Sequence, residues 1–156
     1  KQVGVIGTSA TIRANVYEKE ITSIRKDIKV ISKETPLLAS LIEEDNKQLY
    51  QKGIIESYLL DESLAHIDSL ILGCTHYPLI EEQINNFYEK KIKLISSIKN
   101  IGNILQSSLE KNNLLNLEKN PVKHDFYVSD YTRVFQEKTQ LFFPSSIILE
   151  EENIFS

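Results

Sequence analysis

A short segment places a thiol and an imidazole where an apolar run ends and a helix is expected to begin. Cys74, Thr75 and His76 follow the apolar residues 69–72 and precede Pro78. The free N–H groups and positive dipole at a helix N-terminus favour an anion, so this position promotes the reactive thiolate. His76 could shuttle a proton or hold an anionic group. The same residues also suit an inert, buried Cys74 with Thr75 and His76 as caps, and the local sequence leaves both interpretations open.

A second junction of the same kind carries hydroxyl groups. Thr8, Ser9 and Thr11 follow the apolar run 3–6 and the small residue Gly7. Three hydroxyls beside a helix N-terminus could hold a carboxylate or a phosphate. The simpler interpretation, which the residues alone favour, is that Thr8 or Ser9 caps the next helix. The segment lacks the lysine and the glycine spacing of a P-loop, so that nucleotide-binding motif is excluded.

Several other chemistries of cysteine and histidine fit the sequence poorly. A structural zinc site needs about four ligands, and one cysteine with three scattered histidines is too few. A cysteine-phosphatase loop needs an arginine soon after the nucleophile, and no basic Lys or Arg stands between Cys74 and Lys90. A cysteine protease would pair Cys74 with a distant histidine, His66 or His124, and the sequence does not decide that question.

Glu43 is a further candidate, although its surroundings are not distinctive. It follows the apolar pair 41–42 and precedes Glu44 and Asp45. A run of acidic residues at the end of a short helix usually forms a solvated face. On the residues alone, Glu43 would be assigned to that face.

The elements that must position these groups follow from the alternation of short apolar runs with amphipathic stretches. This pattern predicts strands at 3–6, 28–31, 69–72, 92–95, 125–128 and 147–150. It predicts helices at 12–25, 37–44, 49–66 with a possible interruption at Gly53, 79–89, 98–110 and 132–142. The Asn-rich stretch 111–123 is expected to be a loop. Repeated strand–helix alternation predicts an α/β fold with a largely parallel sheet, whose ligands bind beyond the carboxyl ends of the strands.

The composition narrows the class of protein further. The 156 residues carry a net charge of −4, which gives no electrostatic reason to expect nucleic acid or an anionic membrane as a partner. No apolar run approaches the roughly 20 residues that span a bilayer, and no signal peptide is recognisable. A single cysteine cannot form an internal disulfide, which fits a reducing cytoplasm. Because a buried strand begins almost at residue 1, we expect the chain to be a portion of a longer protein.

Three segments in the same order resemble the glutamate racemases. Residues 71–79, Ile-Leu-Gly-Cys-Thr-His-Tyr-Pro-Leu, resemble the second cysteine motif of that family nearly letter for letter. Residues 3–11 are similar to its mid-chain strand and threonine loop, and residues 36–43 to its proline-leucine helix with a glutamate. The resemblance is strong over residues 3–90 and weaker beyond, although 125–149 is similar to the family's C-terminal strand–helix–strand.

The resemblance implies a fold of two similar α/β domains with the active site between them. Residues 1–96 would form the second domain, and residues 97–156 would return to the first. It implies a cytoplasmic enzyme, expected to be a homodimer, that interconverts L- and D-glutamate without a cofactor and supplies D-glutamate for peptidoglycan synthesis. Two cysteines, one on each face of the α-carbon, would act as acid and base.

The resemblance also implies roles for individual residues. Cys74 would be one of the two cysteines, with His76 and Glu43 assisting its proton transfers. Thr75, Thr8 and Thr11 would bind the substrate's carboxylates or amino group. No lysine is singled out for a pyridoxal Schiff base, and no metal ligand set is implied.

The sequence also departs from the family. The Asp-Ser turn, the Tyr-Gly pair and the first catalytic cysteine of the family's first half are not among these residues, so residues 1–156 alone are expected to be inactive. Residues 96–99, Ser-Ser-Ile-Lys, stand where the family has an Asp-Ser-Gly-Glu type stretch. Aspartate-type relatives resemble this chain but carry glutamate at the position of His76. A non-catalytic α/β ligand-binding module is the alternative from another class.

Overall fold

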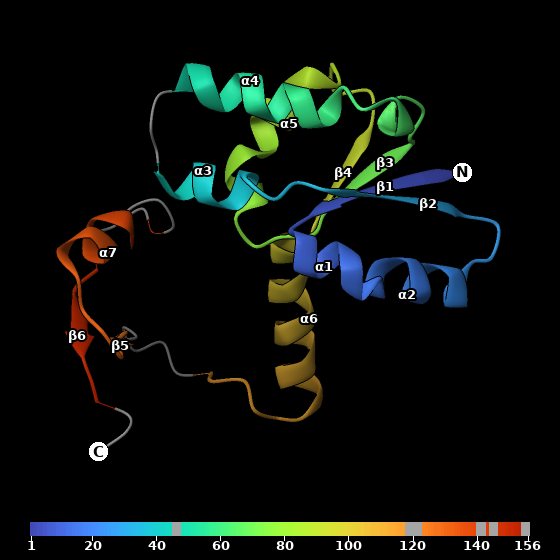
Figure 1. Ribbon diagram of the computed structural model, residues 1–156. Helices are drawn as coiled ribbons and strands as arrows, with labels where there is room; N and C mark the ends of the chain where they lie inside the picture. The colour runs from blue at the N-terminus through green and yellow to red at the C-terminus, as the bar shows by residue number, and fades with distance from the viewer. Residues whose placement is uncertain (45–47, 118–122, 140–142, 144–146, 154–156) are drawn as a thin grey trace. The chain divides into compact units, whose positions relative to one another are not determined.

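A four-stranded parallel sheet lies at the centre of the first of two compact units, residues 1–114 and 115–156. The computed structural model describes residues 1–44, 48–117, 123–139, 143 and 147–153. The strands are β1 (Gln2–Gly7), β2 (Lys29–Glu34), β3 (Ser69–Leu72) and β4 (Lys93–Ser96), in the order β2-β1-β3-β4 (Figure 1). In the central strand, Val5 lies opposite Ser32 of β2 and Ile71 of β3. The predicted parallel α/β fold is confirmed.

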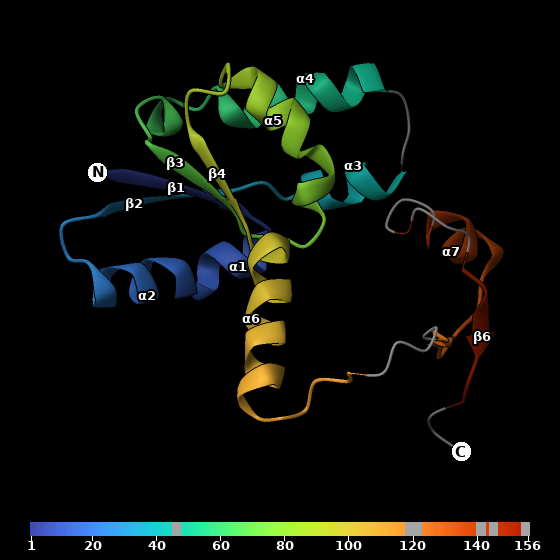
Figure 2. The ribbon, with the colours of Figure 1, turned by 180° about the vertical axis from the view of Figure 1, so that it is seen from behind.

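Two short helices cover one face of this sheet, as both ribbon views show (Figures 1 and 2). They are α1 (Ser9–Ala14) and α2 (Val16–Ile24). The prediction of one continuous helix over 12–25 is wrong, because Asn15 takes the left-handed conformation with a φ of 53°. Its N–H donates to the carbonyl of Ile12 at 3.0 Å, which closes α1. Asparagine tolerates this conformation better than other residues with a Cβ, which explains the position of the break.

The opposite face is covered by α3 (Leu38–Glu44), α4 (Gln48–Leu59) and α5 (Glu81–Phe87), with 3₁₀ turns at Glu62–Leu64 and Tyr77–Ile80 (Figure 1). The predicted helix over 49–66 ends early, at Leu59, and Gly53 does not interrupt it. Asp61 then caps the first 3₁₀ turn by accepting from the Ser63 N–H at 3.0 Å. The core between these helices and the sheet consists of Ile6, Leu38, Ile42, Ile55, Leu59, Leu64, Ile67, Leu70, Leu72, Tyr77, Ile80 and Ile84.

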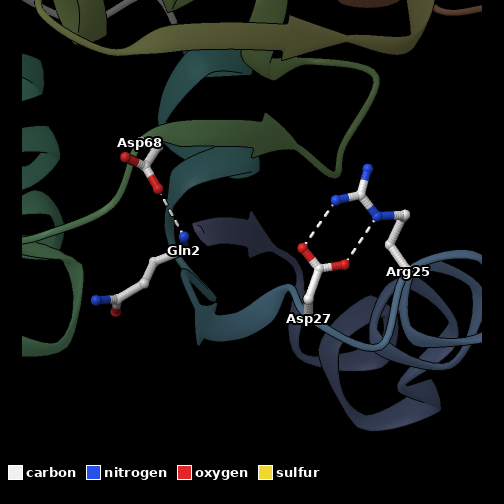
Figure 3. Close-up of polar contacts among 4 residues, drawn as sticks. All are labelled: Gln2, Arg25, Asp27 and Asp68. Atoms are coloured by element: carbon white, nitrogen blue, oxygen red, sulfur yellow. Dashed lines mark hydrogen bonds and ion pairs between the residues drawn. The ribbon is translucent and has the colours of Figure 1, made fainter.

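Polar contacts fasten the amino ends of the strands, at the edge of the sheet shown in Figure 3. The Gln2 N–H donates to Asp68 Oδ2 at 2.7 Å, and the Asp68 N–H donates to the Gln2 carbonyl at 2.8 Å. In the turn between α2 and β2, Arg25 donates from Nε and Nη2 to the two oxygens of Asp27, both at 2.8 Å. Such a two-point pair fixes the geometry of both side chains.

The chain continues into α6 (Ser97–Lys111), directly after β4. The division into two compact units falls after Leu114, so α6 belongs to the first unit. The family resemblance implies a domain boundary elsewhere, between residues 96 and 97. That boundary concerns membership of the family's domains and stays a prediction. No helix among the described residues is long and apolar enough to cross a membrane.

The second unit contains a pair of parallel strands, β5 (Phe126–Val128) and β6 (Leu149–Glu151), with α7 (Arg133–Lys138) between them in sequence. The ring of Phe126 packs edge-on against Phe143, with centroids 5.3 Å apart. The predicted strand–helix–strand order is confirmed. The predicted end of the helix, residues 140–142, lies outside the described residues.

Candidate active site

The candidate residues meet at one edge of the sheet because all four strands are parallel and end there. Thr8 follows β1, Thr35 follows β2 and Cys74 lies two residues beyond β3. The N–H of Gly73 donates to the carbonyl of Ile6 at 2.8 Å, which holds the start of the cysteine loop against β1. A Cβ added at Gly73 would lie only 2.8 Å from that carbonyl oxygen and 3.6 Å from a methyl of Thr11. Glycine at this position therefore allows the cysteine loop to lie against the backbone of β1.

Cys74, His76 and Glu43 form a continuous chain of polar contacts. Cys74 Sγ lies 3.7 Å from His76 Nδ1, and His76 Nε2 lies 2.7 Å from Glu43 Oε1. The side chain of His76 is 23% exposed and that of Glu43 is 45% exposed. The cysteine loop and α3 are thus brought together although they are some 30 residues apart in sequence, and the acidic side chain of Glu43 is not merely part of a solvated face.

The contacts are consistent with one tautomer of the neutral imidazole. An ionised Glu43 carboxylate can only accept a hydrogen bond, and beside it His76 Nε2 would be the donor. In the neutral ring this leaves Nδ1 as the acceptor, on the side of Cys74 Sγ. Thr75 Oγ1 also lies near Nδ1, at 3.5 Å. The arrangement lets the imidazole take a proton from the thiol while the carboxylate stabilises the resulting imidazolium.

The threonine loop has a structural role that its sequence predicts. Thr8 caps α1 by accepting from the Thr11 N–H at 3.3 Å, and the two side-chain hydroxyls lie 3.0 Å apart. The cap interpretation is therefore confirmed for Thr8. Both residues are partly exposed at the edge that carries Cys74.

The charge of Glu34 is stabilised beside this loop. Glu34 ends β2 at the same edge of the sheet. Hydrogen bonds from Ser9 and Arg13 hold the pKa of the Glu34 carboxyl below its ordinary value, and the bond from Ser9 has the larger effect. Arg13 Nε lies 3.3 Å from Glu34 Oε1. Ser9 is thus engaged with a carboxylate of its own chain, which leaves Thr8 and Thr11 as the loop's candidate ligands.

Two further residues of this edge were not anticipated from the sequence. Thr35 and Tyr77 are both fully buried, and their hydroxyl oxygens lie 2.6 Å apart. Burial raises the pKa of Tyr77 to about 12, against the opposing effect of the hydrogen bond with Thr35. The sequence offered only one indication of their role, which is their position: Thr35 directly follows β2, and Tyr77 directly follows His76.

Other features of the described residues do not join this cluster. A depression of about 390 Å³ lies between α4 and α5, and none of the candidate residues lines it. Among the residues that the structure describes, no group of three His, Cys, Asp or Glu side chains is placed to hold a metal ion.

Comparison with known proteins gives a consistent result. No family profile matches the sequence. The glutamate racemase of Lactobacillus johnsonii is 34% identical over 140 residues, which cover 90% of this chain and 53% of the relative. That of Chlorobium phaeobacteroides is 35% identical over 148 residues, covering 94% and 54%. The chain thus spans about half the length of these curated relatives.

Solved structures agree with the sequence matches. A glutamate racemase isoform of Bacillus anthracis superposes with a TM-score of 0.88 at 31% identity, covering 98% of this chain and 57% of that one. The glutamate racemase of Francisella tularensis, solved in complex with D-glutamate, superposes with a TM-score of 0.84 at 34% identity and the same coverage. Since these likenesses in sequence and fold run through nearly all of residues 1–156, the chain belongs to the glutamate racemase family.

Proposed function

We propose that the protein that contains this chain interconverts L- and D-glutamate, with Cys74 as the acid/base on one face of the substrate. The observation that supports this most directly is the contact chain from Cys74 through His76 to Glu43. Removing a proton from the α-carbon needs a base that can be regenerated, and an imidazole held between a thiol and a carboxylate can both take and return the thiol's proton. An inert structural cysteine has no need of such neighbours.

The inversion also needs a group on the opposite face. Cys74 is the only cysteine of the 156 residues, so the second thiol must come from outside them. In each turnover Cys74 as thiolate takes the α-proton while the opposite thiol gives one to the other face, and in the reverse direction their roles exchange. The electron pair left at the α-carbon is stabilised by hydrogen bonds and dipoles in a closed cleft, which requires no cofactor.

The hydroxyl groups beside Cys74 are the proposed substrate ligands. Thr8 follows β1, Thr11 lies in the first turn of α1, and Thr75 lies between Cys74 and His76. Hydroxyls can donate to the carboxylates of glutamate or accept from its ammonium group. The Francisella tularensis relative was solved with D-glutamate bound, which supports a ligand of this class.

The proposed organisation follows the family's two-domain fold. Residues 1–96 would form the second domain and residues 97–156 would return to the first. The apolar residues of α6 support this, since Ile98, Ile101, Ile104 and Leu105 are 54–67% exposed in this chain and would gain a partner there. The full protein, on this proposal, is a cytoplasmic homodimer that supplies D-glutamate for peptidoglycan synthesis.

The test is substitution in the full-length enzyme, followed by circular dichroism of the glutamate pool. Cys74→Ser should nearly abolish racemisation while the fold persists, because a serine hydroxyl does not ionise at neutral pH. Glu43→Gln should lower kcat about 10²-fold, the size expected for assistance to a proton transfer. Glu44→Gln, which changes the exposed neighbour in the same way, serves as the matched control and should leave kcat unchanged. Near wild-type turnover by Cys74→Ser would contradict the proposal.

A further inference from the structure

Three separate parts of the candidate site converge on the buried pair formed by Thr35 and Tyr77. Thr35 contacts the carbonyl of Gly7, where the threonine loop begins, through its N–H at 2.9 Å and its hydroxyl at 3.1 Å. Its own carbonyl accepts from the Leu38 N–H at 3.1 Å, at the start of the helix that carries Glu43. Tyr77 directly follows His76 and reaches the same residue with its hydroxyl.

The contact between the two side chains is short and wholly enclosed. The hydroxyl oxygens lie 2.6 Å apart, and the Tyr77 hydroxyl also donates towards the Thr35 carbonyl at 3.3 Å. Both residues are 0% exposed, so water cannot replace either partner without opening the core. The Thr35 hydroxyl also donates to the Gly7 carbonyl, so the two side chains belong to one buried hydrogen-bond network. A satisfied buried network favours one arrangement of the two loops over its alternatives.

We infer that the Thr35–Tyr77 hydrogen bond is a positioning device for catalysis, which holds the Cys74–His76 loop in register with α3 and the threonine loop. The inference rests on the proposed racemase function. Neither residue touches the reacting atoms: Tyr77 acts through His76, its neighbour in sequence, and Thr35 acts through Gly7 and the start of α3. The pair thereby sets how far His76 Nε2 lies from Glu43 and how the thiol lies relative to Thr8 and Thr11.

The chain offers a matched control for the loss of one buried phenol hydroxyl. Tyr88 is only partly buried as a residue, whereas Tyr77 is completely buried, but the hydroxyl of Tyr88 is enclosed and burial likewise raises its pKa to about 12. Among the described residues its hydroxyl has no hydrogen-bond partner. Tyr77→Phe and Tyr88→Phe therefore each remove one enclosed phenol hydroxyl, but only the first breaks a contact between parts of the site.

The first experiment uses the full-length enzyme well below the melting temperature of every variant. Tyr77→Phe and Thr35→Val should each lower kcat about tenfold, as expected for a small misplacement of catalytic groups. KM should stay within about twofold, because the substrate's own ligands are retained. Thr35→Ser keeps the hydroxyl and should restore kcat, and Tyr88→Phe should leave it unchanged. A purely structural role would lower only the melting temperature.

The second experiment also uses the full-length enzyme but does not depend on turnover. Amide hydrogen exchange at Cys74 and His76 should accelerate about tenfold in Tyr77→Phe and Thr35→Val, relative to wild type and Tyr88→Phe, because the loop opens locally. Equal exchange in all four proteins, or equal kcat for Tyr77→Phe and Tyr88→Phe, would overturn the inference. If the full-length wild type does not racemise glutamate, the proposed function fails, whereas the exchange data still decide whether the pair holds the loop.

Discussion

The two edges of the central sheet are built from different kinds of polar contact. At the amino edge, charged and polar groups pair with one another: Gln2 with Asp68, and Arg25 with Asp27 (Figure 3). At the carboxyl edge, a thiol, an imidazole and several hydroxyls are gathered over loops that follow β1 and β3. The same strands thus end in structural pairs on one side and in chemically reactive groups on the other.

The difference shows how the fold separates stability from activity. Exposed ion pairs at the amino edge contribute little each and act by fixing turns. The carboxyl edge depends instead on a buried support, because the reactive groups stay accessible while Thr35 and Tyr77 are completely enclosed beneath them. Changes at the amino edge should therefore affect unfolding, and changes at the carboxyl edge should affect substrate use. The predictions below test that division.

The largest effect is expected when residues 1–156 are tested without the rest of the protein. Residues 1–156 alone should not racemise glutamate, because one thiol cannot serve both faces of the α-carbon. The half of the pocket that contacts the substrate's other face would also be missing, so binding should fail as well. Purified residues 1–156 should show no change in the optical activity of glutamate and no α-deuterium incorporation. Turnover comparable to that of a full-length relative would show that a single thiol suffices.

A smaller effect is expected from the threonine loop, where one residue has two roles. Thr8→Val removes the cap of α1, which should cost about 1 kcal/mol of folding stability. If Thr8 also binds a substrate charge, kcat/KM should fall further, by the roughly 1.5–3 kcal/mol that a hydrogen bond to a charged group contributes. Thr11→Val should lower kcat/KM in the same range.

The second unit provides a matched cap for that experiment. Thr132 caps α7 by accepting from the Phe135 N–H at 3.1 Å and has no proposed substrate role. Thr132→Val should therefore lower the stability about as much as Thr8→Val and leave kcat/KM unchanged. If Thr8→Val lowers the melting temperature but not kcat/KM, its hydroxyl is a cap and nothing more.

The strands that position the site were predicted from the sequence better than the contacts among the site's residues. The strands of the sheet and the placement of Cys74 beyond one of them follow from short-range apolar patterns, which strand burial imposes directly. The helix break at Asn15 was missed because the apolar spacing on both sides still fits one helix, and only the backbone of a single residue departs from it. Residue-level conformations of this kind leave no periodic signal.

Long-range contacts were harder to predict because no local pattern encodes them. Thr35 and Tyr77 are 42 residues apart, and neither differs by type from an ordinary cap or core residue. Glu43 would have been assigned to a solvated acidic face without the family resemblance, since its contact with His76 depends on how α3 packs beside the cysteine loop. The partner of each group is decided by the assembled sheet.

The smallest effect is expected at the amino edge, from the pair of Arg25 and Asp27. The hydrogen bonds from Arg25 lower the pKa of Asp27 from 3.8 to about 2. Because the folded-state pKa lies below the unfolded one, the pair stabilises the fold fully above pH 3.8, and this contribution is lost as the pH falls towards 2. Asp27→Asn should therefore show a small loss of stability in urea unfolding at neutral pH, reduced by added salt, that disappears near pH 2. Arg25→Gln should lose the same pH-dependent component, and the double variant should lose no more than either single one.

Catalysis by the full-length enzyme should be unaffected in all three variants, since the pair of Arg25 and Asp27 lies at the edge of the sheet opposite Cys74. A fall in kcat/KM with unchanged stability would show that the two edges are coupled.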